Sequence, residues 1–362
     1  MANLKQKPLN GRYVPQKAIL TAILAAGLFG ICSPISKILL SDLAPTMMAA
    51  LLYLGAGLGM GTVHFIRQIR QRQQLEARIT RNELPWVIAM ILLDVAAPIF
   101  LMLGLTLTPA ATASLLNNFE IVATAAIAMI FFKEPLNNRM WLAIVLITLS
   151  CMVLSVEDYR SLALSSGSFF VLAACLCWGV ENNCTRMLSI KDPLQTVIIK
   201  GFGSGTGALI IAMCAGEVNG SIPYILLALF LGFVSYGLSI YFYIAAQREL
   251  GAARTSVYYA AAPFIGVLIS WIVLQEGLTQ SFLVALLIML AGTYFAITEK
   301  HTHAHAHEEG THEHRHSHND GHHTHVHGDH IIGEHTHEHA HEAITHSHTH
   351  TPEIHHQHTH QH

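Results

Sequence analysis

The amino-acid sequence predicts an all-α integral membrane protein with ten transmembrane helices, arranged as an inverted five-helix repeat and followed by a disordered histidine-rich C-terminal tail. Three observations lead to this prediction. Hydrophobic residues make up 52% of the chain and charged residues only 12%, about half the share of charge in a soluble domain. Apolar runs of about 20 residues, long enough to cross a bilayer, recur before residue 300. The segment 24–59 also aligns without a gap with 172–207.

The histidines and cysteines divide the chain into two parts. All but one of the 26 histidines follow residue 300, where large apolar side chains are scarce. The six cysteines all lie within apolar runs, so we expect small buried residues and no disulfide framework. A membrane-embedded part is therefore followed by a polar appendage.

Each predicted helix is an apolar run, and most runs contain the glycine or proline that membrane helices tolerate. Pro34, Pro98 and Pro263 are examples. The ten predicted helices are 18–40, 45–66, 84–105, 108–132, 139–156, 166–188, 193–215, 223–246, 254–274 and 279–298.

The positive charges between these runs predict the orientation, because cytoplasmic loops are enriched in lysine and arginine. With the N-terminus inside, the outside loops hold only Arg160. We therefore expect a multi-pass protein of the plasma membrane with both termini, and hence the tail, in the cytoplasm. The inside segments hold Lys5, Lys7, Arg12, Lys17, Arg67, Arg70, Arg72, Arg78, Arg81, Lys133, Arg139, Arg186, Lys191, Arg248 and Arg254.

An odd number of helices in each copy makes the second copy upside down relative to the first. Four segments follow: a cytoplasmic N-terminal segment (1–17), a first repeat (18–157, helices 1–5), a second repeat (166–298, helices 6–10) and the histidine-rich cytoplasmic tail (299–362). Inverted repeats of this kind are typical of transporters that alternate the access to a central site.

The turns after the fourth and ninth predicted helices carry matching glutamates, in FFKEPL (131–136) and VLQEGL (273–278). Together with the duplication and LGAAR (250–254), these turns resemble the EamA-type repeats of the drug/metabolite transporter superfamily. The resemblance covers residues 18–298 and implies a ten-helix transporter, often an exporter of metabolites or amino acids. One departure is Ile121, which stands where the second repeat has Pro263.

Five charged residues lie inside the predicted helices, where charge is costly and marks pathways or relays. In the repeat alignment Glu120, Glu181 and Lys200 each stand opposite an uncharged residue. One interpretation is substrate or proton binding at the centre; the other is a buried pair of Asp94 or Glu181 with Lys200. For Lys37 we expect snorkelling to the interface. The candidate substrate- or proton-binding residues are Glu120, Asn117, Asn118, Asp94, Glu181, Asn182 and Lys200.

Alternate glycines at 55–61 and 201–207 lie inside membrane helices, without the strand of a nucleotide-binding loop. We expect them to allow close helix packing or flexing. No nucleophile–base–acid grouping stands out, so we expect no enzyme and no nucleic-acid partner.

The tail repeats a His-x-His pattern and has too few apolar residues to pack a core. Neutral imidazoles among carboxylates suit Zn²⁺, Ni²⁺, Co²⁺ or Cu²⁺; the alternative is a solvated tail that responds to pH. No cofactor is required by the membrane part. The candidate ligands are His301, His303, His305, His307, His312, His314, His316, His318, His322, His323, His325, His327, His337, His339 and His341.

We therefore predict a secondary-active transporter of small polar metabolites, proton- or ion-coupled, with a metal-binding cytoplasmic tail. Its partners are the lipid bilayer, a small-molecule substrate and divalent metal ions at the tail; a homodimer is left open. A first alternative is a divalent transition-metal permease regulated by the tail, which the near absence of histidine from the membrane part disfavours. A second is a membrane metal sensor or storage protein that transports nothing.

Overall fold

The computed structural model describes residues 16–70, 81–132, 136–158, 163–188, 192–250, 255 and 258–298, and four segments of the tail (302–307, 310–316, 335–341 and 344–349). The chain before the tail is almost entirely helical. Its first half comprises α1 (Gln16–Gly30), α2 (Cys32–Leu39), α3 (Pro45–Arg70), the 3-10 turn η1 (Arg81–Glu83), α4 (Leu84–Leu107), α5 (Ala110–Leu116), α6 (Phe119–Phe132) and α7 (Asn138–Ser155).

The second half follows a small antiparallel pair of strands, β1 (Val156–Asp158) and β2 (Ala163–Leu164). It contains one π-helical segment, η2, between two α-helices. Its helices are α8 (Ser166–Arg186), α9 (Pro193–Ala215), α10 (Ile222–Gly232), η2 (Phe233–Leu238), α11 (Ser239–Leu250), α13 (Ala262–Leu274) and α14 (Gln280–Ile297).

Short polar side chains set where several helices begin. The side chains of Asn137, Ser165, Asp192 and Thr279 each accept a hydrogen bond from a backbone N–H in the first turn that follows. These are the residue types that best satisfy the free N–H groups at a helix start. The chain leaves α9 at Gly216, whose φ of 69° suits a residue without a Cβ.

Eight segments in the described part of the chain are long and apolar enough to cross a membrane. They agree with eight of the ten predicted runs. The other two runs contain α8, which has 21 residues but carries Glu181, Asn182 and Asn183, and α13, which has 13 residues. The total of ten crossings stays a prediction. The eight segments are Gln16–Leu39, Pro45–Ile69, Leu84–Leu107, Ala110–Phe131, Asn138–Ser155, Leu194–Ala215, Ile222–Ala246 and Gln280–Ile297.

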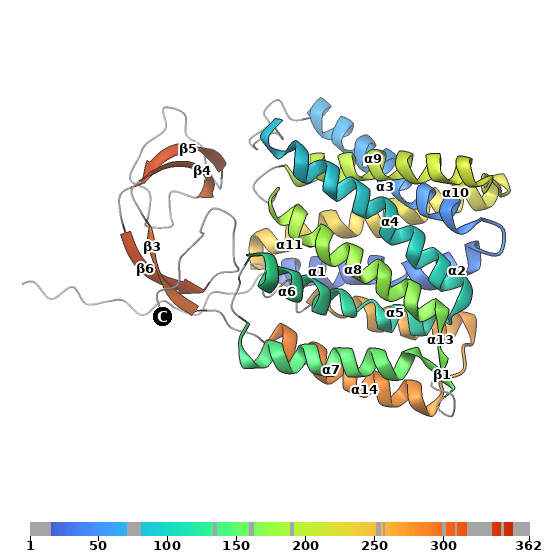
Figure 1. Ribbon diagram of the computed structural model, residues 1–362. Helices are drawn as coiled ribbons and strands as arrows, with labels where there is room; N and C mark the ends of the chain where they lie inside the picture. The colour runs from blue at the N-terminus through green and yellow to red at the C-terminus, as the bar shows by residue number, and fades with distance from the viewer. Residues whose placement is uncertain are drawn as a thin grey trace, which may run out of the picture.

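The two halves pack against each other along their whole length (Figure 1). Helix α3 packs on α9 at one side of the bundle, and α7 packs on α14 at the other. Between these pairs α4 packs on α8, α1 on α11 and α5 on α13. Every one of these pairs joins a helix of the first half to a helix of the second.

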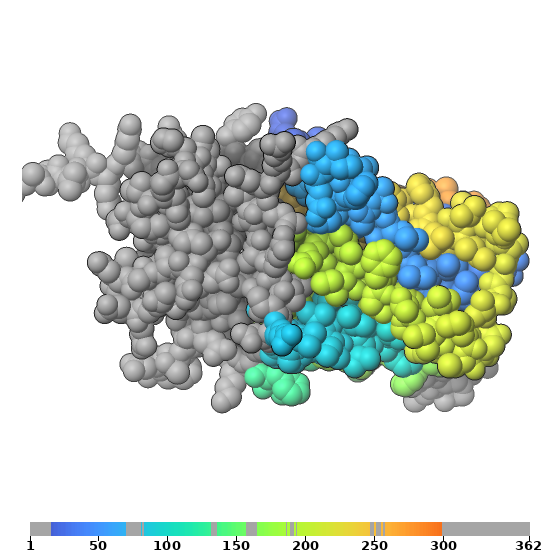
Figure 2. Space-filling model, turned by 90° about the horizontal axis from the view of Figure 1, so that it is seen from above, coloured from blue at the N-terminus to red at the C-terminus, as the bar shows by residue number. Residues whose placement is uncertain are grey.

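We call the alternate glycines at 55–61 on α3 and at 201–207 on α9 the glycine ladders. Half of these glycines lie at the contact between α3 and α9, which run side by side in Figure 2, and the others face α4, α10 or η2. A Cβ on Gly57 would lie 3.0 Å from the backbone of Gly201, and a Cβ on Gly205 would lie 2.7 Å from the backbone nitrogen of Leu54. Residues later in one helix thus face residues earlier in the other, so the two helices are antiparallel. The expectation of close packing is confirmed here, since side chains larger than hydrogen would push the backbones apart.

Polar side chains fasten the two halves at the end of the bundle where α2 and α13 end. The amide of Ala44 donates to Asn219 Oδ1 (2.9 Å), and that of Ser221 donates to Asp42 Oδ2 (2.7 Å). Glu276 accepts from the backbone nitrogens of Ala110 (2.7 Å) and Ala111 (2.8 Å), so it caps α5 from the other repeat. Its repeat partner Glu134 lies outside the described residues.

The described segments of the tail form strands, which corrects the expectation of a disordered tail for these segments. Strand β3 (Thr302–His307) pairs antiparallel with β6 (Ile344–Thr349), and β4 (Gly310–His316) pairs with β5 (His335–His341). Histidine at every second residue gives these segments the two-residue period of a strand. The expectation of disorder rested on the low content of apolar residues, which does not depend on the order in which the residues alternate.

Candidate functional site

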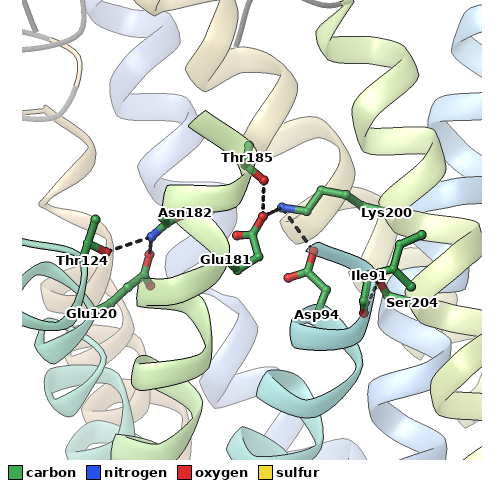
Figure 3. Close-up of polar contacts among 9 residues, drawn as sticks. All are labelled: Ile91, Asp94, Glu120, Thr124, Glu181, Asn182, Thr185, Lys200 and Ser204. Atoms are coloured by element: carbon green, nitrogen blue, oxygen red, sulfur yellow. Dashed lines mark hydrogen bonds and ion pairs between the residues drawn. The ribbon is translucent and has the colours of Figure 1, made fainter. Parts of the chain in front are cut away.

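Three of the predicted charged residues meet at one point inside the bundle (Figure 3). The Nζ of Lys200, on α9, lies 2.8 Å from Glu181 Oε1 on α8 and 3.2 Å from Asp94 Oδ2 on α4. The side chains of Asp94 and Glu181 are 0% and 3% exposed, and that of Lys200 is 12% exposed. Thr185 also donates to Glu181 Oε1. The structure therefore places Lys200 beside both of the carboxylates considered as its partner.

Glu120 belongs to a second polar group on the other side of α8 (Figure 3). Asn182 Nδ2 donates to Glu120 Oε1 (2.6 Å) and lies 3.2 Å from Thr124 Oγ1. Glu120 and Thr124 are one turn apart on α6, and Asn182 directly follows Glu181 on α8. Glu181 and Asn182, which are adjacent on α8, thus belong to different groups. Helix α8 lies between Glu120 and the group of Asp94 and Lys200.

The fourth predicted transmembrane helix is broken just before Glu120. Helix α5 ends at Leu116 and α6 begins at Phe119, which puts Glu120 in the first turn of α6 and not in the middle of a continuous helix. The N-terminal end of a helix favours negative charge, and broken helices supply binding sites at the midplane of many transporters. The helix break therefore stabilises a negative charge on Glu120 at this position.

The two predicted asparagines, Asn117 and Asn118, lie at the break itself. Asn118 is buried, and its Nδ2 donates to Leu115 O (3.1 Å) within the break. Cys175 Sγ lies 3.8 Å from Asn117 O. The Asn118 side chain thus bonds within the turn between α5 and α6, while Glu120, Thr124 and Asn182 form the polar group.

Aromatic side chains that the sequence analysis did not select lie next to both groups. The rings of Tyr53 and Tyr236 are 5.1 Å apart, and Phe29 lies 6.1 Å from Tyr236 and 5.8 Å from Tyr259. Tyr53 is beside Asp94, and Tyr259 lies within electrostatic range of Glu120. We call Phe29, Tyr53, Tyr236 and Tyr259 the aromatic wall. It extends from the first polar group to the second.

The repeat alignment contained a signal for part of this wall. Tyr236 is the residue that aligns with Asp94, and it lies in η2. A π-helical turn inside an α-helix is rare and is found mostly at functional sites. The sequence signal for the other tyrosines of the wall was their position inside apolar helices. Packing in the hydrophobic core would explain that position equally well.

Two polar groups at this place have no hydrogen-bond partner among the described residues. Neither oxygen of Asp94 accepts a hydrogen bond, although Lys200 is close, and the hydroxyl of Tyr236 has no partner. Both residues are buried. Buried polar groups without a hydrogen bond are costly and rare, so Asp94 and Tyr236 are candidates for contact with a bound molecule.

Lys37 bonds to the end of a neighbouring helix. Its ammonium donates to Thr108 O (3.0 Å) and to Leu105 O, which are carbonyls at the end of α4. Cations stabilise the C-terminal end of a helix. Lys37 therefore has a structural partner and lies apart from the central groups.

The predicted metal ligands of the tail fall on strands or outside the described residues. Strand register places His312 opposite His339 and His314 opposite His337. Elsewhere in the part of the chain whose side chains are described, no group of three His, Cys, Asp or Glu side chains is placed to hold a metal ion. His301, His318, His322, His323, His325 and His327 lie outside the described residues, whereas His303, His305 and His307 lie on β3, His312, His314 and His316 on β4, and His337, His339 and His341 on β5.

The chain resembles known transporters in sequence. The EamA-like transporter family matches residues 16–156 and again residues 165–298. An uncharacterized transporter of Methanothermobacter thermautotrophicus is 29% identical over 304 residues, which cover 79% of this chain and 88% of that protein. The uncharacterized transporter YyaM of Bacillus subtilis is 21% identical over 186 residues, or 47% of this chain and 59% of that protein.

A solved crystal structure supports the fold. It has 17% sequence identity and a TM-score of 0.55, and the match covers 77% of this chain and 95% of that one. At this level of identity the likeness concerns the arrangement of the helices alone.

Proposed function

The chain belongs to the EamA-like transporter family, and from this premise we propose that it is a secondary-active transporter of small polar metabolites, of the amino-acid or drug/metabolite exporter type. Transport is coupled to protons or another ion, because carboxylates in the bundle interior can exchange a proton or a cation during each cycle. The membrane part does no covalent chemistry.

The observation that carries this proposal is the position of Glu120. The side chain of Glu120 lies at a helix break and is hydrogen-bonded to Asn182 of the second half. Asn182 directly follows Glu181 on α8, and Glu181 belongs to the group of Asp94, Glu181 and Lys200. A carboxylate at the contact of two halves feels any change in their relative position. Substrate binding at Glu120 and movement of the halves are therefore linked.

The helix contacts support ten crossings in an inverted five-helix repeat. The pairs α3–α9, α5–α13 and α7–α14 each join predicted helices that occupy the same place in the two repeats. The pairs α1–α11 and α4–α8 exchange under the same operation. A two-fold axis in the membrane plane produces this pattern and makes α3 and α9 antiparallel, as they are. During transport the two halves rock about the central site. The protein lies in the plasma membrane, and both termini face the cytoplasm.

Glu120→Gln tests the proposal. The amide keeps the size and one hydrogen bond to Asn182 but has no charge to exchange, so we expect transport to be lost while expression is retained. The measurement is profiling of metabolites and metals that cells take up or release with each variant. Glu83→Gln, the same change at the edge of the bundle beside α4, serves as the matched control. Unchanged transport in the Glu120→Gln protein would contradict the assignment.

The tail adds a second proposed activity, the binding of Zn²⁺, Ni²⁺, Co²⁺ or Cu²⁺. Its support is the number of histidines and the register of β4 and β5, in which histidine is opposite histidine at every second pair of residues from His312 to His316. Removal of residues 299–362 should abolish metal binding measured by calorimetry and leave metabolite transport in place. Loss of every phenotype in the truncated protein would instead favour a membrane metal sensor.

A further inference from the structure

The interior of the bundle carries more negative than positive charge. Among the described helices its centre holds three carboxylates, Asp94, Glu120 and Glu181, and one ammonium, Lys200. Lys37 does not change this balance, because its ammonium is bound to carbonyls at the end of α4. With all four central groups ionised, two negative charges have no positive partner. Uncompensated charge inside a membrane protein is costly, so the site favours a positively charged occupant.

The free hydrogen-bonding groups lie where such an occupant would be bound. Asp94 Oδ2 has an ion-pair partner in Lys200 (3.2 Å), but neither oxygen of Asp94 nor the buried hydroxyl of Tyr236 has a hydrogen bond to a described residue. Asp94 is next to Tyr53 and within electrostatic range of Tyr236. An ammonium group could satisfy these acceptors, whereas a second carboxylate would be repelled by them.

The surface between the two acidic groups is aromatic. The four rings of the aromatic wall form a row in the order Tyr53, Tyr236, Phe29 and Tyr259. The centroids of neighbouring rings in this row are 5.1 to 6.1 Å apart. The faces of such rings attract organic cations, and aromatic side chains are the usual means of binding ammonium ligands. A bare metal ion would need several oxygen ligands in place of these rings.

We infer that the substrate of this transporter is an organic cation, with an ammonium group held against the aromatic wall, which lies beside both Asp94 and Glu120. This inference rests on the proposed function and narrows its substrate class from polar metabolites in general to those with a net positive charge. Anionic and zwitterionic metabolites are then poor ligands, because their carboxylate would be repelled by the carboxylates of Asp94, Glu120 and Glu181.

The experiment is isothermal titration of the purified full-length protein in detergent with three ring-matched probes. Phenyltrimethylammonium carries a permanent positive charge, phenylalanine is a zwitterion and benzoate is an anion. We expect heat from phenyltrimethylammonium alone. Binding of phenylalanine or benzoate at the same or higher affinity would overturn the inference, and so would no binding of the cation, since protons alone would then neutralise the acids.

Variants of the aromatic wall test its contribution. Tyr236→Leu removes a ring and should weaken the binding of phenyltrimethylammonium about tenfold, while Tyr236→Phe keeps the ring and should retain affinity within about threefold. Phe29→Leu tests the neighbouring ring if Tyr236→Leu does not give a monodisperse protein. Equal affinity in the leucine variants and the native protein would show that the wall does not bind the cation.

The two proposals fail in different ways. If proteoliposomes take up an anionic or zwitterionic metabolite in a manner that Glu120→Gln abolishes, the proposed function holds and the organic-cation inference is wrong. If phenyltrimethylammonium binds but no metabolite is transported in cells or proteoliposomes, the site is a cation site and the transport function is wrong.

Discussion

Lys200 lies between two carboxylates in the interior of an apolar bundle, and each of the three side chains comes from a different helix. A buried ammonium without a partner is costly, and so is each of these acids. The single positive charge of Lys200 balances one of the two negative charges, so the three ionised side chains together carry a net charge of −1. Glu120, on the other side of α8, adds a second carboxylate without a positive partner.

Substitution of Lys200 should therefore destabilise the protein. Lys200→Met leaves Asp94 and Glu181 without a cation, and we expect a loss of about 3–5 kcal/mol in the free energy of unfolding. The additional change Asp94→Asn should recover part of it, because one uncompensated charge is removed. Thermal unfolding of the purified single and double variants measures both effects. An unchanged midpoint for Lys200→Met would mean that the acids are already neutral in the native state.

At the scale of the elements, the glycine ladders determine how closely α3 and α9 approach. A Cβ on Gly201 would overlap the backbone of Gly57 and lie 3.0 Å from the carbonyl oxygen of Tyr53. Backbone atoms cannot move aside as a flexible side chain can. Tyr53 belongs to the aromatic wall and Lys200 precedes Gly201, so the contact between these helices also positions part of the central site.

Gly201→Ala should separate α3 from α9. Overpacking of this kind costs about 1–3 kcal/mol, and the shift should also reduce binding at the aromatic wall. Gly61→Ala, on the facing ladder of α3, is the matched control, since its nearest neighbours are ring atoms of Phe202 at 3.7 Å or more. Its expected effect is a small gain, because alanine is the better helix former by about 1 kcal/mol. Unfolding midpoints of the two variants distinguish the cases, and equal midpoints would count against close packing.

At the scale of the whole molecule, the proposed orientation rests on the positive charges of the predicted loops. The end with Glu276 and the polar loop contacts is the outer end if both termini are cytoplasmic. Exposed Cys214 lies near that end of α9. The halves are fastened here in the described state, so opening to the outside requires these hydrogen bonds to be released.

Labelling with a membrane-impermeant maleimide checks this orientation. We expect Cys214 to react in intact cells and Cys214→Ser to remove the signal. His301→Cys, placed in the Cys214→Ser background, should react only after the membrane is permeabilised. Reaction of the tail cysteine in intact cells would reverse the orientation and place the histidine-rich segment outside.

The sequence by itself determined the membrane nature of the protein, eight of its crossing segments, its family and the identity of its buried charges. Hydropathy, duplication and isolated charges can be read along the chain without knowledge of packing. Only the tertiary structure decided that Lys200 has two carboxylate partners, that Glu120 follows a helix break, that four aromatic rings lie beside both acidic groups, and that segments of the tail are strands. Those facts depend on how helices cross and rotate against one another. Residues such as Tyr53 and Tyr236 meet across 183 positions of the chain, and no local pattern specifies that meeting.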